Sequence, residues 1–323
     1  MLARVKVNKR LFSKSKEFMD LEYKYGCHNY APIPAVLSRG RGAEVWDVDG
    51  KRYIDCLAGY SAVNQGHCHP KIRQAVLEQT DRITLTARAF YNDRLGVWEK
   101  YLTNLIGYDK VCFMNGGVEA TETAVKFSRR WAYTVKGVPD GQAAILFPKH
   151  NFWGRSIAAC GSSDDPKRFK HFGPFGGLNF HFVEFDDPKA LEAEFIKNPN
   201  IAAYVLEPVQ GEAGIKIPSP GYLKQVRDLC TKYNVLMVLD EVQTGLGRTG
   251  KLMGADWEPG VRADIVCMGK SLSGGFYPIA ATLADEKVMD CIKYDLYYKD
   301  LETMDQLSVE IHCRLLLVLL LYK

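Results

Sequence analysis

The chain has 323 residues, of which 47% are hydrophobic and 25% charged, so it can form one large domain or two ordinary ones. Its net charge is +4, but residues 1–16 carry six Lys and Arg without any acid, so the remainder carries −2 and offers no broad basic face for nucleic acid. Nine cysteines without C-x-x-C spacing favour reduced thiols in an intracellular compartment, and no apolar run reaches the roughly 20 residues of a membrane helix.

The N-terminal part of the chain begins with a basic segment and continues through turns and short apolar runs. Residues 1–16 have the composition of a mitochondrial transit segment, and a solvated arm explains them equally well, so mitochondrial matrix and cytoplasm both stay open. Alternating runs flank Asp49-Gly50 and predict a hairpin over 43–55. Apolar residues at helical spacing predict a helix that begins at Pro70.

From about residue 108 onward, apolar strands alternate with helices. Strands that are apolar on both faces predict a mainly parallel, seven-stranded type of sheet covered by helices, which is an α/β fold. Ligands of such sheets bind at the carboxyl ends of the strands. The predicted strands are 110–115, 143–147, 180–185, 201–207, 235–240, 265–268 and 278–283, and the predicted helices are 118–136, 188–198 and 221–233.

Two of the predicted strands end near a lysine and an acid that suit one cofactor. Asp240 ends the run 235–240, and Lys270 follows the run 265–268. A lysine amine forms a Schiff base with an aldehyde, and a carboxylate keeps a pyridine nitrogen protonated, so the pair is what pyridoxal phosphate chemistry requires. Taken singly, Asp240 is as well explained as a helix cap and Lys270 as a solvated loop residue.

Further polar and glycine residues lie at the same predicted edge of the sheet. The segment 115–120, with Gly116 and Gly117, joins a strand to a helix and could form a phosphate cup, although a tight turn explains the glycines alone. Phe152 could stack on a flat heterocycle and Arg155 could bind a substrate carboxylate. Core packing and a surface position are the plain alternatives for these two residues.

Three motifs point to other chemistry and are rejected. The glycines of 245–250 match G-x-G-x-x-G, but no amphipathic helix follows them, as dinucleotide binding requires. Gly269-Lys-Ser271 resembles the end of a P-loop, but Asp264 stands where the first glycine is needed. His67-Cys-His69 has no second cluster at metal-ligand spacing, so we expect no metal site.

Taken together, the motifs resemble the class III, fold type I, pyridoxal phosphate-dependent aminotransferases, and within that family most closely those that act on ornithine. The resemblance covers about residues 16–292 and is carried by the segments 23–30, 59–70, 85–91, 151–155, 207–214, 240–245 and 269–275. It implies that residues 17–69 belong to a small N-terminal α+β segment and residues 70–293 to the large cofactor-binding domain. It also implies a homodimer with active sites at the interface.

The resemblance implies a role for each candidate site residue. Lys270 would be the Schiff-base lysine and proton shuttle, Asp240 would bind the pyridinium nitrogen, and Gln243 the ring hydroxyl. The phosphate would be held through the N–H groups of Gly117 and Val118. Phe152 would stack on the ring, and Tyr30 and Arg155 would orient ornithine. The implied cofactor-binding set is Gly116, Gly117, Val118, Phe152, Glu207, Asp240, Val242, Gln243 and Lys270, and the implied substrate-binding set is Tyr30, Tyr60, Arg155 and Glu212.

The implied reaction transfers the δ-amino group of L-ornithine to 2-oxoglutarate, with acetylornithine and 4-aminobutyrate as alternative donors. The sequence departs from the family in three ways. Gly116 stands where the family usually has Ser or Thr. The resemblance also stops near Lys293, so two later elements are expected to be absent: a Gly-Ser-Thr-Tyr-Gly-Gly-type segment that supplies phosphate contacts to the partner subunit, and the C-terminal small domain with its gating arginine. Residues 294–323 indicate a frame-shifted, mis-spliced or truncated product that would be catalytically incompetent, or else a genuine divergent tail.

Overall fold

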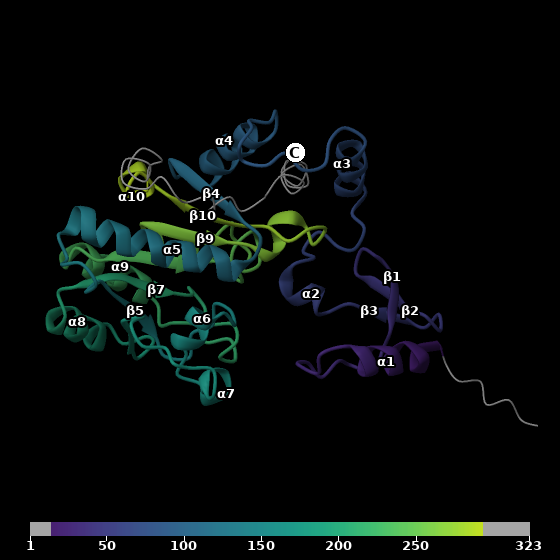
Figure 1. The fold of residues 1–323 in the computed structure, drawn as a ribbon, viewed down its shortest axis with the longest axis horizontal. Helices are drawn as coiled ribbons and strands as arrows, with labels where there is room; N and C mark the ends of the chain where they lie inside the picture. The colour runs from purple at the N-terminus through teal and green to yellow at the C-terminus, as the bar shows by residue number, and fades with distance from the viewer. Residues whose placement is uncertain (1–13, 293–323) are drawn as a thin grey trace, which may run out of the picture.

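A seven-stranded mixed sheet forms the centre of the computed structural model, which describes residues 14–292 (Figure 1). Its strand order is β4-β10-β9-β8-β7-β5-β6. The neighbouring strands from β9 through β8, β7 and β5 to β6 all pair in parallel. Only β10 runs antiparallel to both of its neighbours, β4 and β9. The strands are β4 (Lys110–Met114), β5 (Ala144–Pro148), β6 (Phe180–Val183), β7 (Ile201–Leu206), β8 (Leu236–Asp240), β9 (Ile265–Met268) and β10 (Ala280–Ala284).

The predicted fold class, a mainly parallel seven-stranded sheet covered by helices, is confirmed. The direction of β10 has a local cause. The link between β9 and β10 contains only the short turn Lys270–Ser273, whereas a parallel return needs a longer crossover, usually a helix. The strand predicted at 278–283 therefore forms, but it runs against its neighbours.

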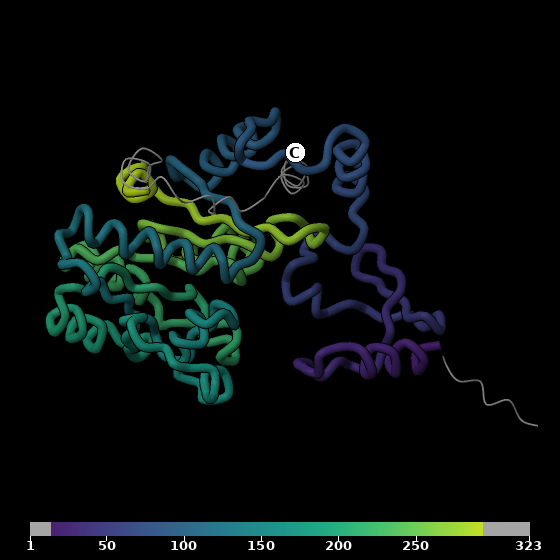
Figure 2. Tube along the Cα trace, in the orientation of Figure 1, coloured from purple at the N-terminus to yellow at the C-terminus, as the bar shows by residue number. Residues whose placement is uncertain are grey.

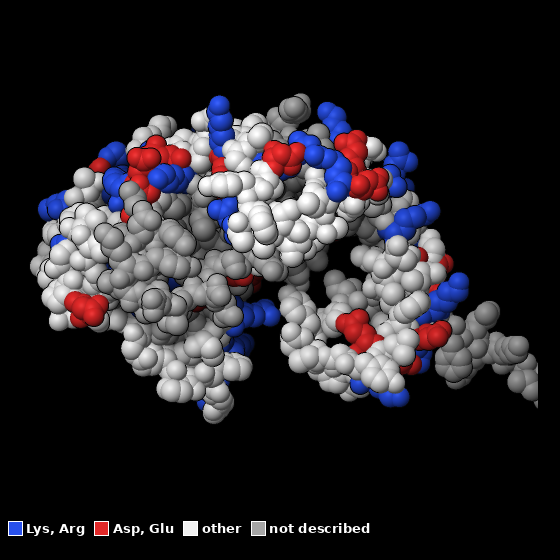
Figure 3. All heavy atoms as spheres, turned by 45° about the horizontal axis from the view of Figure 1, so that its top comes forward, with Lys and Arg blue, Asp and Glu red and all other residues white. Residues whose placement is uncertain are grey.

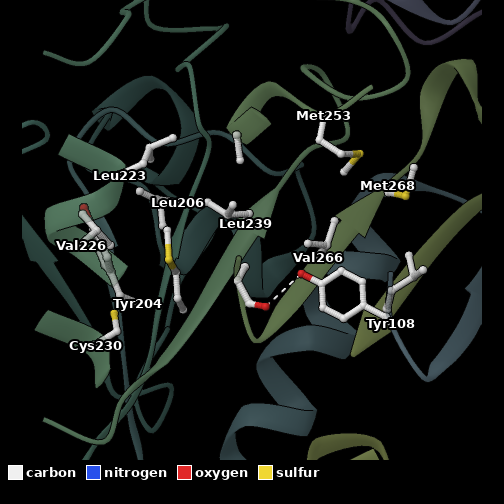
Figure 4. Close-up of a cluster of buried hydrophobic side chains, with 14 of the residues drawn as sticks. Tyr108, Tyr204, Leu206, Leu223, Val226, Cys230, Leu239, Met253, Val266 and Met268 are labelled. Carbon is white, nitrogen blue, oxygen red and sulfur yellow. Dashed lines mark hydrogen bonds between the residues drawn. The ribbon is translucent and has the colours of Figure 1, made fainter. Parts of the chain in front are cut away.

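Helices cover both faces of this sheet. Along β8, Met237 and Leu239 face one hydrophobic cluster while Leu236 and Val238 face the other, as the alternation of a strand requires. Figure 4 shows residues of the first cluster, among them Leu239 of β8 and Leu223 and Val226 of α9, and the Tyr108 hydroxyl, which donates to the Ala263 carbonyl at 2.9 Å. The first face is covered by α4 (Leu95–Ile106), α8 (Pro188–Lys197) and α9 (Tyr222–Lys232), and the second by α5 (Gly117–Trp131), α6 (Ile157–Gly161) and α10 (Glu286–Met289).

The N-terminal part of the described chain forms a separate three-stranded antiparallel sheet (Figures 1 and 2). The hairpin predicted over 43–55 is present, and Asp47 holds its turn by accepting from the N–H groups of Asp49 and Lys51 at 3.0 and 2.8 Å. The helix predicted from Pro70 is also present. The elements are α1 (Lys14–Tyr25), β1 (Leu37–Arg41), β2 (Glu44–Asp47), β3 (Arg52–Ile54), α2 (Ala58–Ser61) and α3 (Pro70–Thr80).

Other segments refine the predicted boundaries. The helix predicted over 118–136 is α5 followed by the π-helical turn Ala132–Lys136. The glycines of 245–250 lead into the 3-10 turn Gly254–Trp257 rather than into a helix. The expectations for residues 1–13 and 294–323 lie outside the described residues, and the predicted division at residue 70 stays a prediction. A short helix, α7, spans Pro166–Phe169.

The described surface is mixed in charge. On the face drawn in Figure 3, acidic and basic side chains lie interspersed. Within residues 14–292, none of the helices combines the length and apolar character that a bilayer span demands. In the same range, no three His, Cys, Asp or Glu side chains are grouped as a metal site would require.

Candidate active site

A cavity of about 450 Å³ opens at the carboxyl ends of β7, β8 and β9. This is the edge at which a sheet of this type binds its ligands. Most of the predicted cofactor-binding residues lie on its wall. The lining residues are Gly117, Val118, Phe152, Trp153, Gly154, Glu207, Gly211, Glu212, Ile215, Asp240, Val242, Gln243 and Lys270.

Asp240 and Lys270, which the sequence predicts as a pair, line this one cavity. Asp240 is only 5% exposed, and its carboxylate accepts from the Val242 N–H at 3.0 Å and the Thr121 hydroxyl at 3.1 Å. Burial raises the pKa of Asp240 to about 6, against the two hydrogen bonds and the charge of Lys270. Burial also lowers the pKa of the Lys270 amine, and the carboxylates of Asp240, Glu212 and Glu207 partly oppose that shift. The lysine is thereby moved towards its free amine form.

Lys270 sits on an unusual backbone. Its φ is +47°, in the left-handed region that a residue with a Cβ rarely adopts. It opens the 3-10 turn Lys270–Ser273 immediately after β9. Such conformations persist where the surrounding structure enforces them, and they concentrate at active sites.

The start of α5 holds the segment for which the sequence predicts a phosphate cup. The Glu119 carboxylate accepts from the N–H groups of Asn115 and Gly116 at 2.9 and 2.7 Å. Gly117 and Val118, as the first residues of the helix, have no intrahelical acceptor one turn back. The N–H of Gly116 is therefore already engaged, and those of Gly117 and Val118, which line the cavity, remain available to an anion.

Gly117 packs so closely against Val242 that a larger residue does not fit without a shift. A Cβ built on Gly117 would lie 2.7 Å from Cγ1 of Val242, so Gly117→Ala must displace a wall of the cavity. We expect a loss of about 1–3 kcal/mol in free energy of unfolding from overpacking. We also expect pyridoxal phosphate to bind about 10-fold more weakly, a loss of about 1.4 kcal/mol.

Gly96→Ala in α4 is the matched control, because a Cβ there meets nothing within 4 Å. It should leave cofactor binding unchanged and slightly raise stability, by about 0.5–1 kcal/mol. Urea unfolding and fluorescence titration with the cofactor measure both quantities. Equal behaviour of the two variants would contradict the proposed tight wall.

Glu207 and Phe152 lie together on another wall of the cavity. The Glu207 carboxylate accepts from the N–H groups of Phe152 and Gly211, each at 3.2 Å. Burial, and then the nearby charge of Asp240, raise the pKa of Glu207 to about 8. The Phe152 ring has the Arg168 guanidinium 4.8 Å from its centroid. Glu207 thus fixes the backbone that carries the aromatic ring.

The four predicted substrate-binding residues are also brought together, although they come from distant segments. The Tyr30 hydroxyl donates to the Tyr60 hydroxyl at 3.1 Å, and the Arg155 guanidinium lies 5.6 Å from the Tyr30 ring centroid. The hydrogen bond from Tyr30 raises the pKa of Tyr60, Glu212 adds to the rise and Arg155 opposes it. Two phenols and a cation therefore form a cluster near Glu212, which lines the cavity, whereas Tyr30, Tyr60 and Arg155 do not line it themselves; we call this cluster the mouth of the site.

These residues fit pyridoxal phosphate. A buried carboxylate, a lysine with a lowered pKa and a helix start with available N–H groups share one cavity. Two residues escaped the sequence analysis, namely Thr121, which binds Asp240, and Ser61, which accepts from Gln243 at 2.9 Å. Thr121 could have been found, since it lies one helical turn after Gly117. Ser61 lies in the segment 59–70 that carries the resemblance, but no local pattern there points to a contact with Gln243.

Comparisons with known proteins agree with this geometry. A family model described as aminotransferase class-III matches residues 25–295. The chain is 58% identical over 279 residues to a probable mitochondrial ornithine aminotransferase of Caenorhabditis elegans. These residues make up 86% of this chain and 65% of the relative. It is 52% identical to the mitochondrial ornithine aminotransferase of Rattus norvegicus, over 86% of this chain and 63% of the relative.

Solved structures show the same likeness. The ornithine aminotransferase of Toxoplasma gondii aligns with a TM-score of 0.89 at 42% identity, over 97% of this chain and 72% of that one. The acetylornithine aminotransferase of Elizabethkingia anophelis aligns with a TM-score of 0.81 at 43% identity, over 95% and 72%. The chain thus spans about 65% of the length of the first curated relatives that it matches.

Proposed function

The chain belongs to the class III aminotransferases, and from that premise we propose that it transfers the δ-amino group of L-ornithine to 2-oxoglutarate. The products are glutamate 5-semialdehyde, which cyclises to pyrroline-5-carboxylate, and glutamate. The observation that carries the proposal is the shared cavity of Lys270 and Asp240, beside the cluster of Tyr30, Tyr60 and Arg155. The names of the relatives support ornithine as the donor.

Lys270 and Asp240 supply the reactive groups of the chain. When bound, pyridoxal phosphate provides an aldehyde that condenses with amines and a ring that accepts electrons. The lowered pKa of Lys270 favours a free amine, which can take a proton from one carbon and return it to another. The Asp240 carboxylate, held by Val242 and Thr121, would keep a proton on the ring nitrogen.

Other residues of the cavity bind and orient the cofactor. The N–H groups of Gly117 and Val118 would hold its phosphate, with the partial positive charge of the helix start. Phe152 would cover one face of the ring, Val242 would pack against it, and Gln243 would bind the ring hydroxyl. Gly116 and Glu207 would act indirectly, through the start of α5 and the backbone of Phe152.

The mouth of the site would orient ornithine by binding its α-amino and α-carboxylate end. Arg155 would bind the α-carboxylate, while Tyr30 and Tyr60 would contact the α-amino end, so that the δ-amine points inward. Glu212 would control which substrate carboxylates enter, through its charge near Tyr60 and Lys270. This placement of one cation and two hydroxyls favours a donor with a free amino acid end.

A donor screen tests the proposal. The full chain, loaded with pyridoxal phosphate, is given L-ornithine, N-acetylornithine or 4-aminobutyrate, each with 2-oxoglutarate, and glutamate formation is measured. We expect ornithine to have the highest kcat/KM. A higher value with either other donor would replace ornithine, and an absence of turnover with all three would overturn the proposed activity.

Arg155→Lys gives a second prediction. Lysine keeps the charge but loses the planar fork that binds a carboxylate in two places. We expect the KM for ornithine to rise about 10- to 100-fold, or about 1.4–2.8 kcal/mol, with the visible absorbance of the bound cofactor unchanged. Arg52→Lys, at an exposed pair with Glu44 in the small sheet, is the control and should leave both unchanged. An unaltered KM in Arg155→Lys would remove Arg155 from the substrate site.

We also propose a homodimer of the chain, with the active sites near the interface. Large hydrophobic side chains are exposed on and after α1, including Phe18, Leu21 and Ile33, and a partner subunit would bury them.

For the compartment, relatives named as mitochondrial support the matrix, with the cytoplasm as the alternative. Sedimentation equilibrium and fractionation of cells test the two proposals.

A further inference from the structure

The turn Ala58–Ser61 is left-handed throughout. The φ angles of Ala58, Gly59, Tyr60 and Ser61 are +50°, +57°, +56° and +71°. Three of these residues carry a Cβ, which crowds the following carbonyl in this conformation. Single residues of this kind occur in many proteins, but three non-glycine residues in one turn need a structure that enforces them.

The start of this turn is held by Asp55. Its Oδ1 accepts from the N–H groups of Leu57 and Ala58, each at 2.8 Å. Its Oδ2 lies 2.7 Å from Nε2 of His67. The carboxylate therefore fixes where the turn begins and joins it to the loop before α3.

The end of the turn is held from the other side of the active site. Nε2 of Gln243, which follows β8, donates to the Ser61 hydroxyl at 2.9 Å. Val63, two residues after Ser61, packs against the loop that follows Lys270: a Cβ built on Gly275 of that loop would lie only 2.7 Å from Cγ2 of Val63. In Figure 1, α2 accordingly lies where the N-terminal part faces the seven-stranded sheet.

Tyr60 and Ser61 thus link the two halves of the site. Tyr60 carries the hydroxyl that accepts from Tyr30, and its neighbour Ser61 carries the hydroxyl that accepts from Gln243. If the turn relaxed towards an unstrained backbone, the Tyr60 ring would leave Tyr30 and Arg155. At the same time, the Gln243 amide would lose the acceptor that orients it.

We propose that Ser61 is a positioning residue, whose hydroxyl latches the left-handed turn to Gln243 and so fixes the cofactor side and the substrate side of the site together. The role of Tyr60 in this inference rests on the proposed function. The latch itself is a property of the cofactor-free chain. The two can therefore be tested separately.

The test is a double-mutant cycle of Ser61→Ala and Gln243→Ala on the full chain. In the cofactor-free chain, the amides of Ala62 and Val63, which donate to the Ala58 carbonyl, report the turn through hydrogen exchange. Loss of one neutral hydrogen bond predicts that Ser61→Ala speeds their exchange, and weakens binding of pyridoxal phosphate, by about 5- to 10-fold each. In the Gln243→Ala background, Ser61→Ala should change either quantity by less than about 2-fold, because the acceptor no longer has its donor.

Asn64→Ala is the matched control. It removes a different link between the two parts, the hydrogen bond from Arg248 to Asn64, and leaves Ser61 and Gln243 in place. It should change cofactor binding by less than about 2-fold. Effects of Ser61→Ala and Gln243→Ala that simply add, or exchange rates that Ser61→Ala leaves unaltered, would overturn the inference. Failure of the wild-type chain to turn over ornithine would overturn the proposed function alone, since the exchange cycle still decides on the latch.

Discussion

Lys270→Ala is expected to abolish amino transfer, with a fall in kcat of at least about 10⁴-fold, and to remove the visible absorbance of a lysine-bound cofactor. Alanine has no amine to join the cofactor and none to carry a proton between carbons. Lys270 is also the lysine that lines the cavity with Asp240. Absorbance spectra with added pyridoxal phosphate and a glutamate assay measure the two losses independently.

Lys136→Ala separates this effect from the general loss of a half-buried lysine. Burial lowers the pKa of Lys136 to about 8, and its Nζ donates to the Ile201 carbonyl at 2.6 Å, so it resembles Lys270 in environment but lies outside the cavity. Lys136→Ala should cost stability and keep the absorbance band. Retention of the band and of turnover in Lys270→Ala would exclude Lys270 as the cofactor lysine.

The sheet and the catalytic pair could be predicted from the sequence because burial on both faces leaves a clear pattern. The predicted strand 265–268 has the same bounds as β9, and β8 ends at Asp240 as predicted. Glu207 and Asp240 then share one edge because parallel strands end together. The same pattern could not give the direction of β10, which depends on the length of its connection.

The mouth of the site and its supports could not be predicted from local patterns. Tyr30, Tyr60 and Arg155 are far apart in the chain, so only the family resemblance placed them together. The left-handed turn Ala58–Ser61 departs from the conformations that its residue types favour. Asp55 holds the start of the turn through local hydrogen bonds, but the partner at its end, Gln243, lies 182 residues away and cannot be recognised from sequence spacing.

Asp240→Asn is expected to act in opposite directions on stability and activity. Burial raises the pKa of Asp240 from 3.8 to about 6 in the cofactor-free chain. An acid whose pKa is raised by folding stabilises the protein most below its unfolded pKa, and this contribution is lost as the pH rises through the folded pKa. The wild-type chain should therefore lose about 1–3 kcal/mol of stability between about pH 4 and pH 7 that the asparagine variant keeps.

Activity should move the other way. Asparagine has no charge with which to keep a proton on the ring nitrogen, so amino transfer should fall by about 10²- to 10⁴-fold. Urea unfolding of the cofactor-free proteins at pH 4, 6 and 8 measures the first effect, and glutamate formation measures the second. Parallel pH curves for the two proteins would show that the carboxylate is not destabilising, and unchanged turnover would show that it is not the partner of the ring. If both effects appear, the same negative charge on Asp240 lowers the stability of the cofactor-free chain and holds the proton on the ring nitrogen of the bound cofactor. Cofactor binding should then stabilise the wild type more than the asparagine variant.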